Sequence, residues 1–343
     1  MLENFKERIN RDFDRHVLVR AFVVSLLILF LVSIASLAIG PVQVSIPKML
    51  QNIFGSSHAL TDFEKTIVWQ IRLPRVLLGI IVGAALAISG GVFQTVFHNS
   101  LADPYLLGAA SGAGLGATIA LVAGGANFAY LPLFAFLGSL LAVVATLLIA
   151  GKFYFDPSTL LLSGIAIGSF FTAIQTYLQQ RHSTTLRPVY SWILGELGNA
   201  TWSQVRWAWG YIAIAIATLI LISKKMDALL LSDDEAHSLG INVKRIRLIA
   251  ILAASFATAT AVAASGLIGF VGLVIPHMVK MLYQNISNKF LIIYGILGGA
   301  FLTLTDLIAR VIISPAQLPI GVITAFIGAP FFLYLLKQRR FNK

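Results

Sequence analysis

The residues best able to bind a charged ligand are arginines placed where apolar runs begin or end. Arg72 and Arg75 stand directly ahead of an uncharged run over residues 76–97. Arg310 lies at the end of another apolar run, close to the end of the chain. A guanidinium group is planar and permanently charged, and it can hold a carboxylate through two parallel hydrogen bonds. The alternative interpretation is that the three arginines lie at a lipid interface with their charged heads in water.

The residues that usually bind metals or phosphate, or act as nucleophiles, are scattered in this sequence or absent from it. The chain has no cysteine, so it offers no thiolate for metal binding or nucleophilic attack. The histidines show no spacing typical of metal ligands, since they occupy positions 16, 58, 98, 182, 237 and 277. Neither a Gly-rich phosphate loop ending in Lys-Ser/Thr nor a His-Glu-x-x-His pair is present. We therefore expect no catalytic residue, no bound metal, no cofactor and no ATP hydrolysis by such a loop.

Composition indicates that the elements around these residues lie in a membrane. Hydrophobic residues make up 58% of the chain and charged residues 11%, with a mean hydropathy of +0.86. Soluble proteins carry about 25% charged residues. A net charge of +11 is compatible with a nucleic-acid partner, but basic loops on the cytoplasmic side of a membrane are the stronger explanation. We expect no nucleic acid.

The sequence contains ten apolar runs suited to a hydrocarbon layer ~30 Å thick. They cover roughly residues 17–39, 72–97, 105–124, 130–151, 159–179, 203–223, 246–265, 267–284, 290–309 and 319–336. This pattern predicts an all-α, polytopic membrane protein with about ten transmembrane helices in one domain over residues 1–343. The run at 17–39 follows a long charged head, so we interpret it as a first membrane helix and not as a cleaved signal peptide.

An even number of spans puts both termini on the same side of the membrane. With the termini inside, 17 of the 25 Lys and Arg residues fall on the inner side. Because positive loops mark the cytoplasmic side, we predict cytoplasmic termini. The same orientation puts Arg72, Arg75 and Arg310 at the outer mouth.

Two polar segments between the spans carry helix signals. The inner segment at about 224–247 has Ser232 ahead of three acidic residues, a typical helix start, and Gly240 as a typical stop. We expect a short helix at about 232–239 there, either part of a solvated loop or a docking surface for a cytoplasmic partner. In the outer segment, residues 189–197 favour a short helix lying at the membrane interface.

Two classes of transporter are compatible with these observations. A secondary transporter needs ionisable residues near mid-membrane, but Asp103, Asp156 and Asp306 all lie near span ends. A channel or permease that draws its energy from another chain therefore fits better. An ion-coupled secondary transporter of a small solute remains the alternative.

Motifs over nearly the whole chain resemble the permease subunits of type II ABC importers, the BtuC/FecCD family. They lie in the family's order and spacing at residues 71–75 (Ile-Arg-Leu-Pro-Arg), 83–90, 94, 99–104 (Asn-Ser-Leu-Ala-Asp-Pro), 107–113, 160–164, 269–277 (Gly-Phe-Val-Gly-Leu-Val-Ile-Pro-His), 306–310, 318–321 and 328–330. One departure is Ser100, where the family usually has proline.

The resemblance implies roles for the residues that match these motifs. The residues that would meet acidic groups on the two lobes of a substrate-binding protein are Arg72, Arg75 and Arg310. The residues that would form a cytoplasmic gate, with a purely structural turn as the alternative, are Asn99, Leu101, Pro157 and Ser158. The residues that would contact the ATPase, within the segment 229–240, are Asp233, Glu235, Leu239 and Gly240.

The same resemblance implies an assembly and a class of cargo. The chain would form a homodimer, or pair with a paralogue, in the cytoplasmic (inner) membrane of a bacterium. Its other partners would be cytoplasmic ATPase subunits, a periplasmic or lipid-anchored binding protein and membrane lipid. The cargo would be a bulky metal chelate. We rank ferric siderophores first, cobalamin and haem close behind, and oxyanions last, because no basic cluster lies mid-span to hold a free anion.

Overall fold

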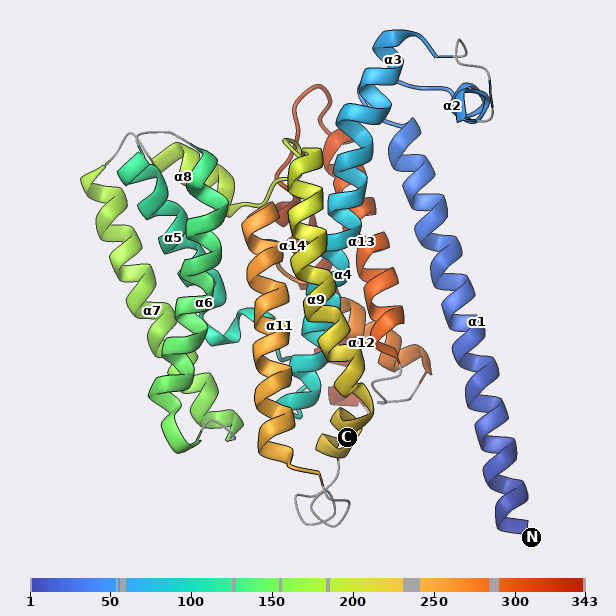
Figure 1. Cartoon of the computed structure of the whole chain (residues 1–343), viewed down its shortest axis with the longest axis vertical. Helices are drawn as coiled ribbons and strands as arrows, with labels where there is room; N and C mark the ends of the chain where they lie inside the picture. Colours follow the sequence, from blue (N-terminus) through green and yellow to red (C-terminus); the bar gives the residue numbers. More distant parts are fainter. Residues whose placement is uncertain are drawn as a thin grey trace.

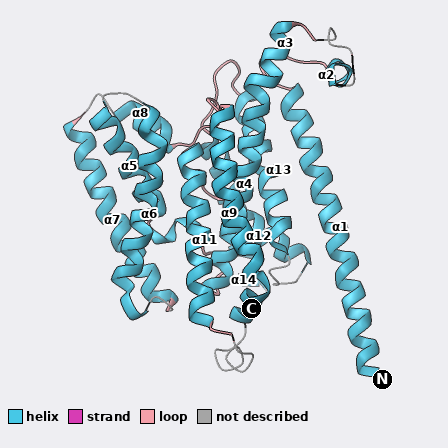
Figure 2. Ribbon diagram, viewed as in Figure 1, coloured by secondary structure: helices cyan, strands magenta, loops and turns pink. Residues whose placement is uncertain are grey.

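The computed structural model of this chain describes residues 2–53, 55, 60–124, 128–153, 156–182, 186–230, 241–283 and 290–341. Within these ranges every regular element is a helix, and the longer helices stand side by side as a bundle (Figure 1, Figure 2). The predicted all-α fold is confirmed.

The bundle is built from long helices that run along one axis in alternating directions (Figure 1). Over the described residues these are α1 (Leu2–Ala38), α4 (Leu73–Val96), α5 (Ala109–Gly124), α6 (Leu131–Ala150), α7 (Pro157–Arg181), α9 (Trp202–Met226), α11 (Val243–Ser265), α12 (Val271–Tyr283), α13 (Leu291–Val311) and α14 (Ile320–Phe341). Seven of them lie in spans long and apolar enough to cross a membrane, while α5, α12 and α14 have shorter apolar stretches. The prediction of about ten membrane helices therefore holds as an approximate number.

Short helices cover the end of the bundle opposite to the two chain termini (Figure 1). They are α2 (Ile46–Ile53), α3 (Asp62–Thr66), the π-helical turn η1 (Ile67–Arg72) and α8 (Leu186–Ile193). The helix expected at 189–197 is thus present but shifted toward the N-terminus. It ends at Ile193 because the chain turns at Gly195, whose φ of +80° is unfavourable for residues with a Cβ atom. The remaining described turns are 3₁₀-helical: η2 (Pro104–Leu107), η3 (Phe128–Tyr130), η4 (Gly151–Phe153) and η6 (Asp227–Leu230).

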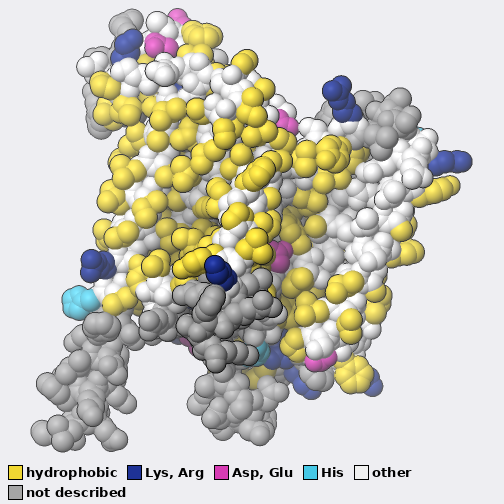
Figure 3. All heavy atoms as spheres, turned by 180° about the vertical axis from the view of Figure 1, so that it is seen from behind, with side chains coloured by type: hydrophobic (Ala, Val, Ile, Leu, Met, Phe, Trp, Pro, Cys, Tyr) yellow, Lys and Arg dark blue, Asp and Glu magenta, His cyan; other side chains and the backbone are white. Residues whose placement is uncertain are grey.

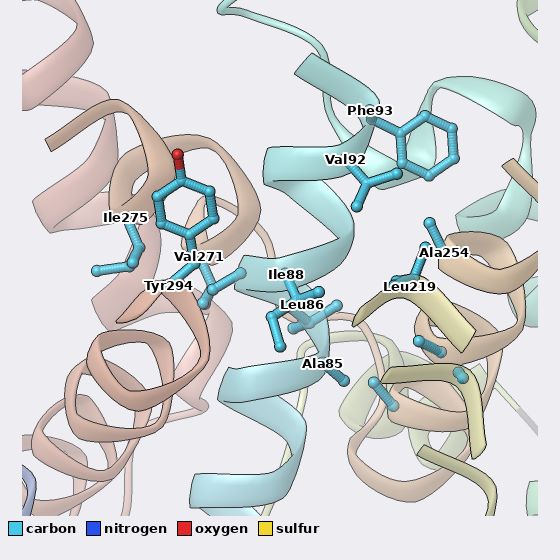
Figure 4. Packing of buried hydrophobic residues seen from close by; sticks show 14 of the residues in the cluster. Ala85, Leu86, Ile88, Val92, Phe93, Leu219, Ala254, Val271, Ile275 and Tyr294 are labelled. Atoms are coloured by element: carbon cyan, nitrogen blue, oxygen red, sulfur yellow. The ribbon is translucent and has the colours of Figure 1, made fainter. Parts of the chain in front are cut away.

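Helix α4 lies at the centre of the bundle and is mostly buried. It packs against α13, α11, α12 and α9. In Figure 4, Tyr294 and Ile275 lie on one side of α4 while Leu219 and Ala254 lie on the other. An apolar helix enclosed by other helices in this way is expected at the core of a membrane bundle.

Glycines allow the closest helix contacts. A Cβ atom on Gly83 of α4 would lie 2.2 Å from the carbonyl oxygen of Gly298 in α13, and one on Gly112 of α5 would lie 2.2 Å from that of Gly138 in α6. These backbones therefore touch directly, as is typical of helix pairs in lipid. The four-residue spacing of small residues in the sequence reflects this packing.

The outer helices expose apolar side chains. Helix α1 stands at one edge, where it packs mainly on α13, and α5, α6 and α7 form a group at the opposite edge (Figure 1). The face in Figure 3 carries apolar side chains over much of its middle, while most of its Lys and Arg side chains lie toward the two ends. Such a surface suits contact with lipid hydrocarbon between two polar interfaces.

Candidate functional site

The predicted docking arginines meet at one end of the bundle around a shared carboxylate. Asp306 lies between two guanidinium groups: Arg75 donates from Nε and Nη2 over 2.8–3.0 Å, and Arg310 Nε lies 3.2 Å from Asp306 Oδ2. All three residues are at most 5% exposed. A charged group so far from water needs a partner of opposite charge. Arg75 provides it for Asp306 through hydrogen bonds, and Arg310 adds an ion pair in which its Nε makes no hydrogen bond.

The third arginine, Arg72, binds the end of helix α1. Its Nη1 donates to the carbonyls of Leu37 and Ala38 over 2.7 and 2.9 Å, and its Nη2 donates to that of Val42. Arg310 also reaches this helix end, where it donates to the backbone carbonyl and hydroxyl of Ser36. The last carbonyls of a helix lack partners within the helix and carry partial negative charge. The arginines therefore hold α1 to the bundle.

We call Arg72, Arg75, Asp306 and Arg310 the outer arginine cluster. It lies where α4 begins and α13 ends, opposite to the chain termini (Figure 1), which is the relative position that the charge pattern predicts. Sequence reasoning did not foresee that the arginines are buried, or that Asp306 is the common partner of Arg75 and Arg310. The pairing with Asp306 could have been predicted from the i,i+4 spacing of Asp306 and Arg310 within an apolar run.

A small cavity borders this cluster. It has a volume of about 140 Å³, and Arg75, Glu196 and Gln317 are among its lining residues. Arg75 Nη1 donates to Gln317 Oε1 over 3.0 Å. The cavity thus connects the buried cluster to the loops that follow α8 and α13.

The four predicted gate residues lie in two turns. In the first, Asn99 Oδ1 accepts a hydrogen bond from the backbone N–H of Leu101 over 2.9 Å, and both residues are exposed. In the second, Pro157 begins α7 and Ser158 is exposed. Both turns follow from local chemistry, since Asn closes Asx turns and Pro is favoured in a first helical turn. The gating role stays a prediction.

Asp156 caps the second turn. Its carboxylate accepts hydrogen bonds from the hydroxyl and backbone N–H of Thr159 over 2.6 and 2.8 Å. These hydrogen bonds, that of the hydroxyl first, hold the pKa of Asp156 below its usual value. The cap remains charged at neutral pH and stabilises the start of α7.

A groove of about 950 Å³ runs along α7, with a mainly apolar wall that also carries hydroxyl and amide side chains. Sequence reasoning did not identify it. Its lining residues come from the 103–111 region and from α7: Asp103, Tyr105, Leu106, Gly108, Ala110, Ser111, Gly164, Ile165, Gly168, Ser169, Thr172, Ala173, Thr176, Tyr177 and Gln180. Asp103 is the one charged residue among them, and burial raises its pKa to about 6. Polar side chains exposed on a membrane helix face water or protein rather than lipid. The four-residue spacing of Thr172, Thr176 and Gln180 in the sequence could have indicated these polar side chains on one face of the helix.

A second groove, of about 670 Å³, is apolar. It lies between α14 and the stretch that joins α11 to α12, and its lining residues are Ile193, Leu194, Leu267, Gly269, Phe270, Gly321, Val322, Ala325, Phe326, Ala329, Pro330 and Leu333. Its chemistry is suited to lipid or to another apolar protein surface.

The predicted ATPase contacts, Asp233, Glu235, Leu239 and Gly240, lie outside the described residues. The flanking elements are described: η6 ends at Leu230, and α11 begins at Val243 after its N-cap Asn242. Both flanks lie at the same end of the bundle as the chain termini (Figure 1).

Comparison with known proteins assigns this architecture to a family. The pattern of the FecCD transport family matches residues 26–338. The chain belongs to this family. FecCD chains are permeases, so the seven apolar spans belong to a multi-pass membrane protein.

Similar FecCD-type permeases carry several names. The chain is 38% identical to the cobalamin import system permease protein BtuC of Halobacterium salinarum, over 88% of this chain and 77% of that protein. It is 35% identical to the Fe(3+)-citrate import system permease protein YfmE of Bacillus subtilis, over 92% and 94%. It is 38% identical to the hemin transport system permease protein HmuU of Yersinia pestis, over 80% and 84%.

Solved structures show the same fold. An inward-facing metal-chelate type ABC transporter aligns with a TM-score of 0.83 at 28% identity, over 94% of this chain and 99% of that chain. PsaBC from Streptococcus pneumoniae in complex with Fab aligns with a TM-score of 0.52 at 16% identity, over 84% and 95%, and the likeness concerns the fold alone.

Proposed function

We propose that the chain is the membrane-spanning subunit of an ATP-driven importer that moves a bulky metal chelate across the cytoplasmic membrane. The main support for this proposal is the structural similarity to a metal-chelate type ABC transporter, with a TM-score of 0.83 over 94% of the chain. Relatives named for cobalamin, ferric citrate and haemin import support a ferric siderophore, cobalamin or haem as the cargo.

The groove along α7 supports this class of cargo. Its volume of about 950 Å³ is within the range of sites that enclose drug-sized ligands. Its wall offers hydroxyl and amide groups but no Lys or Arg, so nothing in it would hold a free oxyanion tightly. A large chelate can therefore slide along this wall without becoming trapped.

The partners follow from the two ends of the bundle. ATPase subunits bind at the end with the chain termini, through segment 229–240, and this end is cytoplasmic. A substrate-binding protein docks at the opposite end. A second copy of the chain, or a paralogue, completes the pathway, and the apolar groove beside α14 gives this partner a suitable surface.

The outer arginine cluster attracts the binding protein through its electric field. The cluster contains three guanidinium groups and one carboxylate, so it carries surplus positive charge. A positive patch attracts a partner with acidic surfaces, and salt screens this attraction across the solvent between the two proteins. Binding of the purified binding protein to the permease should weaken as salt rises, and an affinity independent of salt would contradict this docking mode.

Reconstitution tests the proposed function. The permease, its ATPase and its binding protein are placed in liposomes, and uptake of ferric hydroxamate, cobalamin and haem is measured with and without ATP. We expect uptake of one chelate that requires all three components. Uptake by the permease alone, driven by an ion gradient, would instead support a secondary transporter and refute the proposal.

A further inference from the structure

One side-chain contact joins two turns at the end of the bundle that holds the chain termini. The imidazole Nε2 of His98, just after α4, lies 2.5 Å from the carbonyl oxygen of Leu229 in η6. A carbonyl only accepts hydrogen bonds, so the imidazole N–H donates. The two residues are 131 positions apart in the chain, and the contact therefore exists only in the folded protein.

The η6 side of this contact is firmly held. Ala228 and Leu229 are 4% and 1% exposed, and η6 packs against α9, α4 and α11. The segment predicted to bind the ATPase continues directly from this turn. A force on that segment therefore acts first on the backbone that His98 holds.

The other side of the contact is the turn at 98–103, which includes two of the predicted gate residues. His98 has a φ of +49°, a conformation that is unfavourable for residues with a Cβ atom. The backbone N–H of the next residue, Asn99, donates to the carbonyl oxygen of Gln94 over 3.2 Å. The side-chain Oδ1 of Asn99 accepts a hydrogen bond from the backbone N–H of Leu101 over 2.9 Å. The imidazole is thus carried by the residue that directly precedes the hydrogen-bonded turn of Asn99 and Leu101.

We propose that His98 is a positioning residue that ties the gate turn to η6, so that movement of the ATPase-binding segment is passed to Asn99 and Leu101. This inference rests on the proposed function, in which segment 229–240 meets the ATPase. The tie acts through a hydrogen bond to a backbone oxygen, so it depends on the side chain at position 98 and not on the side chain at 229.

The test uses His98→Gly in the full transporter, because glycine tolerates the positive φ and keeps the turn while removing the imidazole. The matched control is His182→Gly, at the opposite end, where the ring Nδ1 of this C-cap residue contacts the carbonyl of Leu178 in the preceding helix α7. His98→Gln retains an N–H donor of similar reach. Each variant is assayed in liposomes for ATP hydrolysis and for chelate molecules moved per ATP.

We expect His98→Gly to hydrolyse ATP at a normal rate but to move about fivefold fewer chelate molecules per ATP, the lower end of typical coupling effects. His98→Gln should recover most of the loss, and His182→Gly should behave like the wild type. Unchanged transport per ATP in His98→Gly would overturn the tie, and so would a parallel loss of hydrolysis and transport. Absence of ATP-driven uptake in the wild-type complex would instead overturn the proposed function.

Discussion

At the scale of single residues, the outer arginine cluster combines stability with charge. Asp306 is the one carboxylate that contacts both Arg75 and Arg310 in the described structure. Removing one partner from a buried ion pair costs more than the pair itself contributes, because the remaining charge is left in a low-dielectric site. We therefore expect substitution of Asp306 to destabilise the fold more than substitution of any other residue of the cluster.

Replacing Asp306 with asparagine should destabilise the fold by about 3–5 kcal/mol, since two buried guanidinium groups lose their counter-charge. The measurement is thermal unfolding of the purified permease in detergent or nanodiscs. Asp62→Asn is the control, because Asp62 forms an ion pair with Lys65 on the surface, where its side chain is fully exposed, and should change stability by less than about 1 kcal/mol. Equal stability of both variants would contradict the role assigned to Asp306.

Substitution of Arg72 tests whether hydrogen bonds to the C-terminal end of α1 hold this helix to the bundle. Arg72→Lys keeps the charge but loses the planar fork that spans the three carbonyls. We expect a loss of about 1.5–3 kcal/mol and faster hydrogen exchange in residues 36–42. Arg206→Lys, at an exposed position, is the control. Unchanged exchange at the end of α1 would show that packing against α13 is sufficient.

At the scale of helices, backbone contact between α4 and α13 sets the core. Neither helix can accept a methyl group at the crossing, since a Cβ on Gly298 would lie 2.4 Å from both the Gly83 carbonyl oxygen and the Ala87 Cβ. In lipid the hydrophobic effect does not drive helices together, so close van der Waals packing has to do so.

Gly83→Ala should destabilise the bundle by about 1–3 kcal/mol, as expected for a core that has to shift to accept an added methyl group. Gly210→Ala is the control within α9: apart from the adjacent residues and backbone of α9 itself, no described atom lies within 4 Å of the added Cβ, and alanine favours a helix by ~1 kcal/mol over glycine. Thermal unfolding of the two variants should therefore shift in opposite directions. A stabilising effect of Gly83→Ala would refute the close crossing.

At the scale of the whole molecule, the two ends of the bundle differ in chemistry. One end has the buried outer arginine cluster, whereas the other has the gate turns and the flanks of the segment predicted to meet the ATPase (Figure 1). The proposed importer would need such a division, because its cargo delivery and its energy source would act on opposite sides of a membrane. Because of this division, we expect a mutation at one end of the bundle to leave the function of the other end unchanged.

Scrambling residues 232–240 should uncouple ATP hydrolysis from transport while the protein still inserts into the membrane. The reason is that a bistable transporter needs a defined contact through which nucleotide binding biases its two states. Chelate uptake per ATP in proteoliposomes should fall, while binding of the substrate-binding protein at the opposite end should be unchanged. Full transport by the scrambled variant would refute the coupling role of this segment.

Much of this architecture was predictable because hydropathy and charge are local properties of a sequence. Runs of apolar residues predicted the membrane helices, and the distribution of Lys and Arg predicted that Arg72, Arg75 and Arg310 share an end. The turn at Gly195 was missed, because the helix expected at residues 189–197 ran through it. Ordered motifs along the chain indicated the FecCD family, which the match over residues 26–338 confirms.

Other features depend on which helices meet, and a linear sequence does not state this. The burial of the arginines around Asp306, the groove beside α7 and the contact of His98 with Leu229 each join residues from different helices. The π-helical turn that carries Arg72 was equally unforeseen. The sequence by itself determined the membrane class, the helices and the division of charge, since each follows from transfer of nearby residues between water and lipid. Only the tertiary structure decided the partners of each buried polar group, because desolvation forces such groups to pair with whatever the packing brings within reach.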